Sequence, residues 1–424
     1  MTGLLILLVY VAVFAGSFFA VKFLVQSATR DYTSLKTVTF GDESAVVSNR
    51  MASILSIITI FLIWGSFTGS KWVPGFLHAP AAFVGETAFN YTLDNGSGET
   101  DVGTVFVKVV DFGEDAENFE VEPGDGAAKN DALAMNAGRS KTLIFDKNDN
   151  FKRKDGAKVI AIDGDPIRPK LALESSKGRF VLTDKGAISF TPPQGLQMDP
   201  IYLPPPEAVV RRFWEISSEG YRNFTLWQHL GYSLFRVIGG FLFGALIGIP
   251  LGYAMGLNGW FRGWFDPIVE FMRPVPPLAL IPLIIIWFGI GEVGKIILLF
   301  LAALWIMAIA ARSGVSGVRI TKVHAAYSLG ASKWQIMRHV IIPNSLPDIF
   351  TGARVAMGVC WGTVVAAELV AASQGAGMMI MVASKFTLTD IVLMGIILIG
   401  VIGFGIDMIM RWVERKLVPW KGKA

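Results

Sequence analysis

The chain contains 424 residues, of which 52% are hydrophobic and only 17% are charged, and its mean hydropathy is +0.50. This composition excludes an ordinary soluble globular domain, in which about 25% of the residues are charged. The single cysteine, Cys360, excludes an intrachain disulfide, so any soluble part of the chain has to be held together by packing alone.

Apolar runs of membrane-spanning length recur along the chain. A bilayer core of about 30 Å needs about 20 apolar residues in a helix. Such runs occur at 4–25, 51–68, 232–256, 295–311, 349–372 and 391–410, and a shorter run with three prolines occurs at 275–290. The sequence therefore predicts an all-α polytopic membrane protein with about seven transmembrane helices.

The first run, 4–25, is expected to be a retained span rather than a cleaved signal peptide. A signal peptide carries basic residues ahead of its apolar region. Here only Met-Thr-Gly precedes the run, whereas Lys22 lies within it and Arg30 follows it. We expect 1–50 to be an extra transmembrane helix with a cytoplasmic loop, and 51–68 to be the first helix of the core.

Residues 69–203 differ in composition from the rest, because they are rich in Gly, Asp and Asn. Short runs typical of strands occur at 104–110, 142–145, 158–163, 179–183 and 187–190. The tripeptide Asp184-Lys185-Gly186 separates the last two runs and predicts a hairpin turn. We expect a small β-rich extracytoplasmic insert, in which an acidic loop at 111–131 has the composition of a disordered segment.

Two motifs resemble ligand-binding loops but lack the residues that the ligands need. In DKNDNFKRKDG (146–156), Phe151 and Ala157 occupy the positions of the glycine and the glutamate of a calcium loop. In WFGIGEVGKI (287–296), Ile296 replaces the hydroxyl residue of a phosphate-binding loop, and no strand precedes it. The insert contains neither HExxH nor GxSxG. We therefore expect no enzymatic activity, no metal site and no cofactor bound by this chain.

A glycine recurs at every fourth position of the span 232–256. These glycines are Gly240, Gly244, Gly248, Gly252 and Gly256. On a helix they form a groove without side chains, which another helix can approach closely. The groove predicts either tight packing within the chain or a seam between two copies of it.

The basic residues predict the orientation, because positive charge marks the cytoplasmic side of a membrane protein. The loop 312–347 has five Lys or Arg residues and no acidic residue, and the tail 416–424 is also basic. Residues 75–200, in contrast, contain 20 acidic and 14 basic residues. We therefore place the insert outside and 257–274 inside. The net charge of +4 then reflects contact with anionic membrane lipid and gives no indication of nucleic acid.

The stretch VHAAYSLGASKWQIMRHVIIPNSLP (323–347) is amphipathic and basic, although apolar runs flank it. Gly330 permits a sharp bend, and Ser332 is placed to cap a short helix. Pro343 and Pro347 are expected to end this element before the next span. On physical grounds alone, the stretch is equally an interfacial helix or a docking site for a cytoplasmic partner.

The pattern xAAxxxGASxWxxxxxVxxPxxLP in this stretch resembles the coupling loop of ABC-importer permeases. The stretches 203–256, 265–296 and 352–380 are similar to the taurine, aliphatic-sulfonate and nitrate branch of that family. The resemblance implies a core permease domain at 204–415, whose loop 312–347 docks on an ATP-binding subunit. The residues implied in this contact are His324, Ala325, Ala326, Gly330, Ala331, Ser332, Lys333, Trp334 and Pro343.

Some features depart from the family pattern. His324 stands where the family usually has glutamate, so the contact with the ATPase could be altered or sensitive to pH. The extra first span and the insert have no counterpart in the usual six-span members.

The resemblance implies the permease subunit of an ATP-driven importer in the bacterial inner membrane. Two copies would pair with two ATP-binding subunits, which hold ATP and magnesium, and an extracytoplasmic binding protein would deliver the solute. The expected solute is small and anionic or zwitterionic, first taurine or an alkanesulfonate, alternatively nitrate or bicarbonate. A secondary transporter, or a receptor without an ATPase partner, is the alternative from another class.

Ionisable side chains inside spans are candidates for the translocation pathway, because they cost about 2.5–3.5 kcal/mol to insert. Arg236, near the outer start of its span, would attract an anion, or it would snorkel or pair with a carboxylate. Glu368 repels anions, so a gate or a helix-packing pair suits it better. We also expect Trp361, Thr363 and Gln374 to line the pathway, where Trp361 would offer a cation–π surface to an ammonium group.

Overall fold

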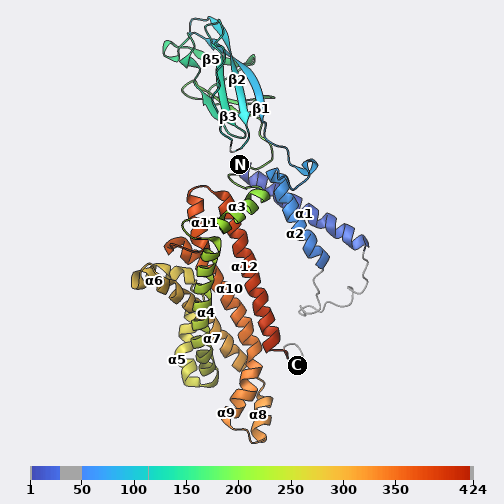
Figure 1. Cartoon of the computed structure of the whole chain (residues 1–424), viewed down its shortest axis with the longest axis vertical. Coiled ribbons are helices and arrows are strands. Elements are labelled where there is room, and N and C mark those ends of the chain that lie inside the picture. Colours follow the sequence, from blue (N-terminus) through green and yellow to red (C-terminus); the bar gives the residue numbers. More distant parts are fainter. Residues whose placement is uncertain (1, 29–49, 113, 421–424) are drawn as a thin grey trace. The chain divides into compact units, whose positions relative to one another are not determined.

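The computed structural model describes residues 2–28, 50–112 and 114–420 of the chain, which divides into two compact units, Met1–Ala208 and Val209–Ala424 (Figure 1). The expected cytoplasmic loop at 29–49 and the end of the basic tail lie outside the described residues.

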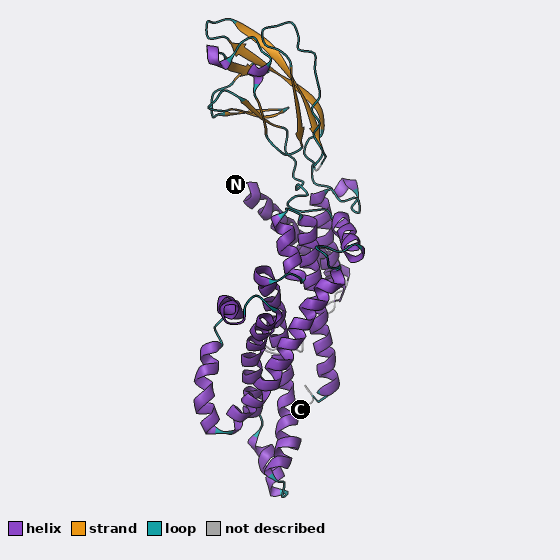
Figure 2. Ribbon diagram, turned by 60° about the vertical axis from the view of Figure 1, so that its left-hand side comes forward, coloured by secondary structure: helices purple, strands orange, loops and turns teal. Residues whose placement is uncertain are grey.

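The first unit begins with two helices, α1 (Thr2–Ala28) and α2 (Arg50–Thr68). They cover the first two predicted spans. A β-rich insert follows them, which confirms the β-rich expectation for this part of the chain (Figure 2).

The strands of the insert form two sheets. The five-stranded sheet has the order β3-β2-β1-β5-β6, and the four-stranded sheet has the order β4-β9-β8-β7. Neighbouring strands are antiparallel, except that β2 and β3 are parallel. The bounds are β1 Gly85–Asp94, β2 Thr100–Val110, β3 Asp131–Asn136, β4 Lys141–Leu143, β5 Lys158–Ile162, β6 Asp165–Pro166, β7 Ala172–Ser175, β8 Gly178–Leu182 and β9 Ile188–Thr191.

Alternating side chains of the two sheets form one apolar core. Phe89 of β1 lies between Phe180 of β8 and Phe190 of β9, with ring centroids 4.7 Å and 5.3 Å away. All three rings are buried. Alternate positions of a strand point to opposite faces of a sheet, so the intervening residues remain at the surface.

The predicted hairpin turn is confirmed, because Thr183 N donates to Ala187 O and Gly186 has a φ of +75°. The described part of the acidic loop at 111–130 contains no helix or strand. Hydrogen bonds tie this segment to the domain, among them one of 2.8 Å from Ala128 N to Asp101 Oδ2 and one of 2.9 Å from Asn148 Nδ2 to Asn130 O.

The second unit is helical. The amphipathic helix α3 (Pro206–Ser218) leads into it, and its long helices are α4 (Leu226–Leu257), α7 (Glu292–Ser316), α10 (Ile342–Ala371) and α12 (Thr389–Leu417). Shorter elements connect them: α5 (Gly259–Met272), α6 (Ile281–Phe288), α8 (Ile320–Ser328), α9 (Lys333–Ile336) and α11 (Ala376–Lys385).

Five described helices are long and apolar enough to cross a membrane, or six if a bent pair counts as one span. Helix α1 covers the first predicted run, 4–25, of which Val11–Phe23 counts as a shorter apolar helix. The bent pair corrects the prediction for 257–274, which forms helix α5 rather than a loop, at 92° to the segment 277–288. The prolines of the shorter apolar run lie at this bend, where they prevent one straight helix.

The glycine groove of α4 is filled by α7 of the same chain. A Cβ at Gly248 would lie 2.6 Å from Leu304 O, and one at Gly256 would lie 2.9 Å from Val315 Cβ. The other three glycines make equally close approaches to α7. The groove therefore serves packing within the chain, the first of the two explanations that the sequence left open.

Candidate functional site

The basic loop forms an exposed elbow at one end of the helical unit, where α8 and α9 lie (Figure 1). Gly330 turns the chain with a φ of +79°, a value that side chains other than glycine adopt only with strain. Ser332 caps α9, because Gln335 N donates to Ser332 Oγ and Ser332 N donates to Gln335 Oε1. The bend and the cap predicted from sequence are both confirmed.

The elbow exposes large apolar side chains next to basic ones. Leu329 is 88% exposed, Trp334 69% and Tyr327 60%, whereas Ile336 is buried beneath them. Lys333, Arg338 and His339 are exposed as predicted, and so is His324. An apolar cluster of this kind in a wet loop indicates a surface that another protein covers.

Pro343 and Pro347 do not end the element, contrary to the prediction. Helix α9 continues through a π-helical turn, Met337–Ile341, into α10, so that 333–370 forms one membrane-length helix. Pro343 lies directly after the π-helical turn, at the start of α10, and does not end the helix. Asn344 Nδ2 donates to Val340 O at the same junction and satisfies a carbonyl there.

A second candidate site is a buried network of charges near the amino-terminal half of α4. Arg236 is fully buried, and its guanidinium binds Glu292 of α7 through both carboxylate oxygens, at 2.5 Å and 2.7 Å. The same group donates to Glu368 of α10 at 2.6 Å and to the carbonyl of Gln374 at 3.0 Å. Lys295 lies 3.1 Å from Glu292, so two cations balance two carboxylates.

The network fixes the segment between α10 and α11. Glu368 accepts hydrogen bonds from Ser233 Oγ and from Gly377 N, at 2.8 Å and 2.9 Å. Gly375 N donates to His229 Nδ1, so the proton of this neutral imidazole is on Nε2, which donates to Tyr221 O. A side chain at Gly375 would collide with the Glu368 carboxylate.

The residues predicted to line the pathway have different surroundings. Arg236 and Glu368 meet in the ion pair, and Gln374 joins them through its backbone. Trp361 is buried, and its Nε1 donates to Ile399 O at 3.0 Å, so its ring packs between α10 and α12 rather than facing an open space. Thr363 is also buried. The geometry favours a packing pair for Arg236 over the attraction of a free anion.

Sequence reasoning missed the partners of Arg236. Glu292 and Lys295 belong to GIGEVGK, the stretch that resembles a phosphate-binding loop; Gly289 turns the chain there, with a φ of +73°. Their position in the sequence could have identified them as candidates. Two ionisable residues, three positions apart at the start of a span, are neighbours on one helix face.

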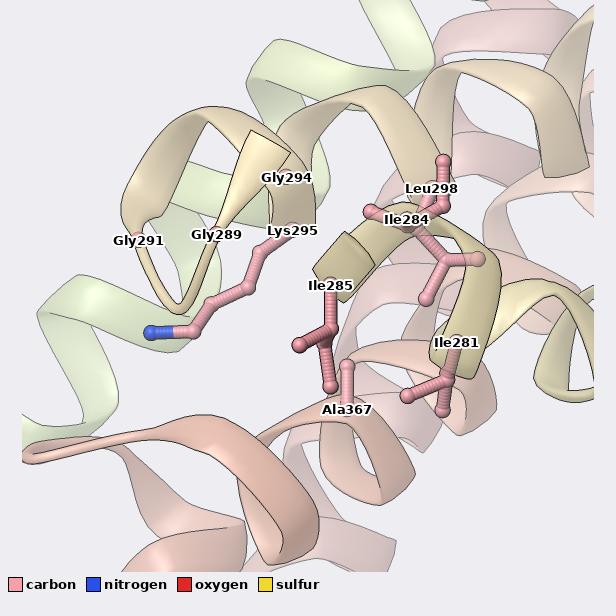
Figure 3. A pocket seen from close by; sticks show the side chains of 9 residues that line it. All are labelled: Ile281, Ile284, Ile285, Gly289, Gly291, Gly294, Lys295, Leu298 and Ala367. Carbon is pink, nitrogen blue, oxygen red and sulfur yellow. The ribbon is translucent and has the colours of Figure 1, made fainter. Parts of the chain in front are cut away.

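A small apolar crevice lies beside this network (Figure 3). Ile281, Ile284 and Ile285 of α6 line it together with Ala367, and the Lys295 ammonium points away from these isoleucine side chains. Its volume of about 20 Å³ is close to that of a single water molecule. This crevice is too small for a solute.

Comparisons with known proteins identify the family of this chain. Residues 240–419 match the model of the binding-protein-dependent transport system inner membrane component. The taurine transport system permease protein of Escherichia coli is 47% identical over 228 residues, which are 54% of this chain and 83% of the relative. The chain belongs to this family of ABC-importer permeases. It is therefore an inner-membrane component of a transport system.

Two further similarities were found. The putative aliphatic sulfonates transport permease of Escherichia coli is 41% identical, over 51% of this chain and 81% of the relative. An inward-facing structure of the methionine ABC transporter MetNI aligns with a TM-score of 0.39 and 18% identity, over 49% of this chain and 98% of its own. The family match begins within α4, so the insert lies outside it.

Proposed function

We propose that this chain is the permease subunit of an importer that carries taurine or a related small sulfonate into the cell. The proposal extends to this chain the solute class that appears in the names of its two Escherichia coli relatives. ATP would be hydrolysed by a separate subunit, because importers of this family divide transport and hydrolysis between chains.

The observation that carries the proposal is the exposed elbow. Burying one large apolar side chain contributes about 1.5–3 kcal/mol, so Leu329 and Trp334 favour a partner that covers them. A cleft in an ATP-binding subunit would take the apolar tip, while Lys333 and Arg338 remain at its rim.

The continuous helix 333–370 provides a way to transmit motion from the elbow. Its 38 residues extend over about 57 Å, at 1.5 Å per residue. Glu368, near its far end, is bound to Arg236 of α4. We infer that a shift of the elbow would tilt this helix as a rigid body and load the buried ion pair, which joins α10 to α4.

The pathway itself would form between two copies of the chain, since the crevice beside the network is too small for a solute. Two ATP-binding subunits would each hold one elbow. An extracytoplasmic binding protein would deliver the solute. The insert would then be an additional outer domain, with a role beyond the common core.

The test is reconstitution of the chain with its ATP-binding subunit and binding protein in liposomes. We expect taurine uptake that requires ATP. Gly330→Val should reduce uptake at least tenfold while ATP hydrolysis persists, because valine strains the bend that aims the elbow.

Gly239→Ala is the matched control and should transport normally, because no atom lies within 4 Å of a Cβ at this position. Uptake by the chain alone without ATP would contradict the proposal. So would full coupling in the Gly330→Val variant.

A further inference from the structure

A basic pocket lies between the inner half of α10 and the carboxyl-terminal end of α12. Arg354 of α10 and Arg411 and Arg415 of α12 line it, and its volume is about 420 Å³. The other lining residues are Glu414, Val418 and Pro419. Three guanidinium groups from two helices therefore meet at one pocket on the side that the basic residues place in the cytoplasm.

Carboxylates balance only part of this charge. Arg354 lies 3.1 Å from Glu414, and Arg411 lies 2.7 Å from Asp407. Arg415 donates only to the backbone oxygen of Arg411, at 3.4 Å, and no ion pair among the described residues includes it. The pocket thus has three cations and two neighbouring carboxylates.

The excess positive charge of the pocket favours an anion. Arg411 and Arg415 are four positions apart on one helix, where like charges repel each other. A helix carboxyl terminus attracts cations, which accounts for basic residues in the last turn of α12. It does not account for Arg354, which a different helix brings to the same place.

An exposed apolar stripe leads from the arginines along α12. Val401, Phe404 and Met408 are exposed and spaced by three and four positions, which places them on the same helix face as Arg411 and Arg415. Trp412 and Trp420 are exposed close to the arginines, as is typical of the membrane–water boundary. The face is therefore apolar where acyl chains would lie and cationic where a headgroup would lie.

We propose that this pocket binds the phosphate of an anionic phospholipid of the inner leaflet. The phosphodiester would accept hydrogen bonds from Arg415 and Arg411, because guanidinium forks match phosphate oxygens. One acyl chain would follow the stripe of Phe404 and Met408. The lipid would join the inner ends of α10 and α12, and α10 is also the helix that carries the elbow.

Native mass spectrometry of the full-length chain purified in detergent tests this proposal. The probes are a phosphatidylglycerol, a phosphatidylcholine with the same acyl chains, and glycerol phosphate without chains. We expect one phosphatidylglycerol to be retained in preference to the other two. Binding should weaken about fivefold for each arginine removed, in Arg415→Gln and in Arg411→Gln/Arg415→Gln.

Arg319→Gln is the matched control, since Arg319 is exposed in the loop 312–347, on the same predicted side of the membrane, and should leave binding unchanged. Thermal unfolding of each variant checks that it is folded. Equal retention of phosphatidylcholine, equal binding of glycerol phosphate, or undiminished binding by the folded double variant would each overturn the proposal.

Discussion

The insert and the helical unit are stabilised in opposite ways. In the insert, large aromatic side chains such as Phe89 and Phe180 fill the space between two sheets, and the polar residues face outward. In the helical unit, close contacts form where side chains are missing, as along the glycines of α4, and the largest fully buried side chain among the described residues is the charged Arg236. Water drives apolar side chains together in a soluble domain, whereas helices surrounded by lipid gain more from close packing and satisfied polar groups.

This contrast shows how position determines the effect of a residue type. A charge is ordinary on the insert surface, and an aromatic ring is ordinary on the outside of the helical unit, where Phe404 and Trp412 are exposed. The substitutions with the greatest effect should therefore be apolar truncations in the insert and charge or size changes in the helical unit.

The largest effect is expected for Arg236→Met. The change leaves Glu368 buried without a cation, which costs about 3–5 kcal/mol. Unfolding of the purified protein, followed by tryptophan fluorescence, should show this loss. The double variant Arg236→Met/Glu368→Met should recover part of it, because Glu292 is partly exposed and can be hydrated.

Arg273→Met is the matched control for that experiment. Arg273 and its partner Glu270 are both exposed, so this variant should lose much less stability. Equal losses in the free energy of unfolding for the two arginine variants would mean that the buried network stabilises the protein no more than a surface ion pair does.

Phe180→Ala should unfold the insert while it leaves the helical unit intact. Removing a buried phenylalanine ring costs about 3–5 kcal/mol, and Phe180 is fully buried in a core that belongs to the first unit alone. Limited proteolysis should then cleave within 85–191 faster, while the helical fragment stays resistant. Loss of the resistant fragment would show that the two units depend on each other.

Structural features that depend on neighbouring residues could be predicted from the sequence, whereas contacts between residues far apart in the chain could not. The spans follow from length and hydropathy, and the elbow follows from Gly330 and Ser332, because a bend and a cap need only neighbouring residues. The partners of Arg236 are 56 and 132 positions away, so no local pattern joins them.

Among the elements that the sequence analysis did not predict, two were missed for other physical reasons. Strand β1 has polar residues at its outward positions, so only Phe89, Tyr91 and Leu93 carry its apolar signal, and its run is not continuous. Helix α5 is amphipathic and contains Pro267, which made its stretch resemble a loop. The two prolines after the elbow were overinterpreted, since Pro343 follows a π-helical turn and Pro347 lies inside α10 without ending it.

The insert should become more stable as the pH falls from 7 to 4.5. Burial, together with the charge of Asp149, raises the pKa of Asp131 from 3.8 to about 6. Between pH 6 and about pH 3.8, the carboxyl group of Asp131 is protonated in the folded protein but ionised in the unfolded chain. This group therefore adds up to about 3 kcal/mol of stability at low pH, which is lost as the pH rises through 6.

Asp131→Asn should remove this dependence of insert stability on pH. The measurement is the protease resistance of the insert as a function of pH. Asp101→Asn is the informative control. Hydrogen bonds from backbone N–H groups, first that of Ala128, lower the pKa of Asp101. The contribution of Asp101 to the stability of the insert is therefore present at neutral pH and lost on acidification. An unchanged pH profile in Asp131→Asn would show that this carboxyl group does not carry the effect.

The smallest effect is expected along the glycine groove. Gly248→Ala places a Cβ 2.6 Å from Leu304 O and 3.0 Å from Met307 Cβ, and it should destabilise the helical unit by about 1–3 kcal/mol. Gly239→Ala, on the same helix but with no atom within 4 Å, should be neutral or slightly stabilising. Thermal unfolding of the two variants gives the comparison directly, and equal melting temperatures would contradict the packing assigned to the groove.

The orientation of the elbow is the claim on which the proposed coupling depends, and cysteine labelling measures it. Cys360, the single cysteine of the chain, is buried and can be replaced by alanine, after which Lys333→Cys provides one exposed thiol on the elbow. We predict that a membrane-impermeant maleimide labels it only after cells are opened, and that the ATP-binding subunit then protects it. Labelling of Lys333→Cys from outside intact cells would contradict the account.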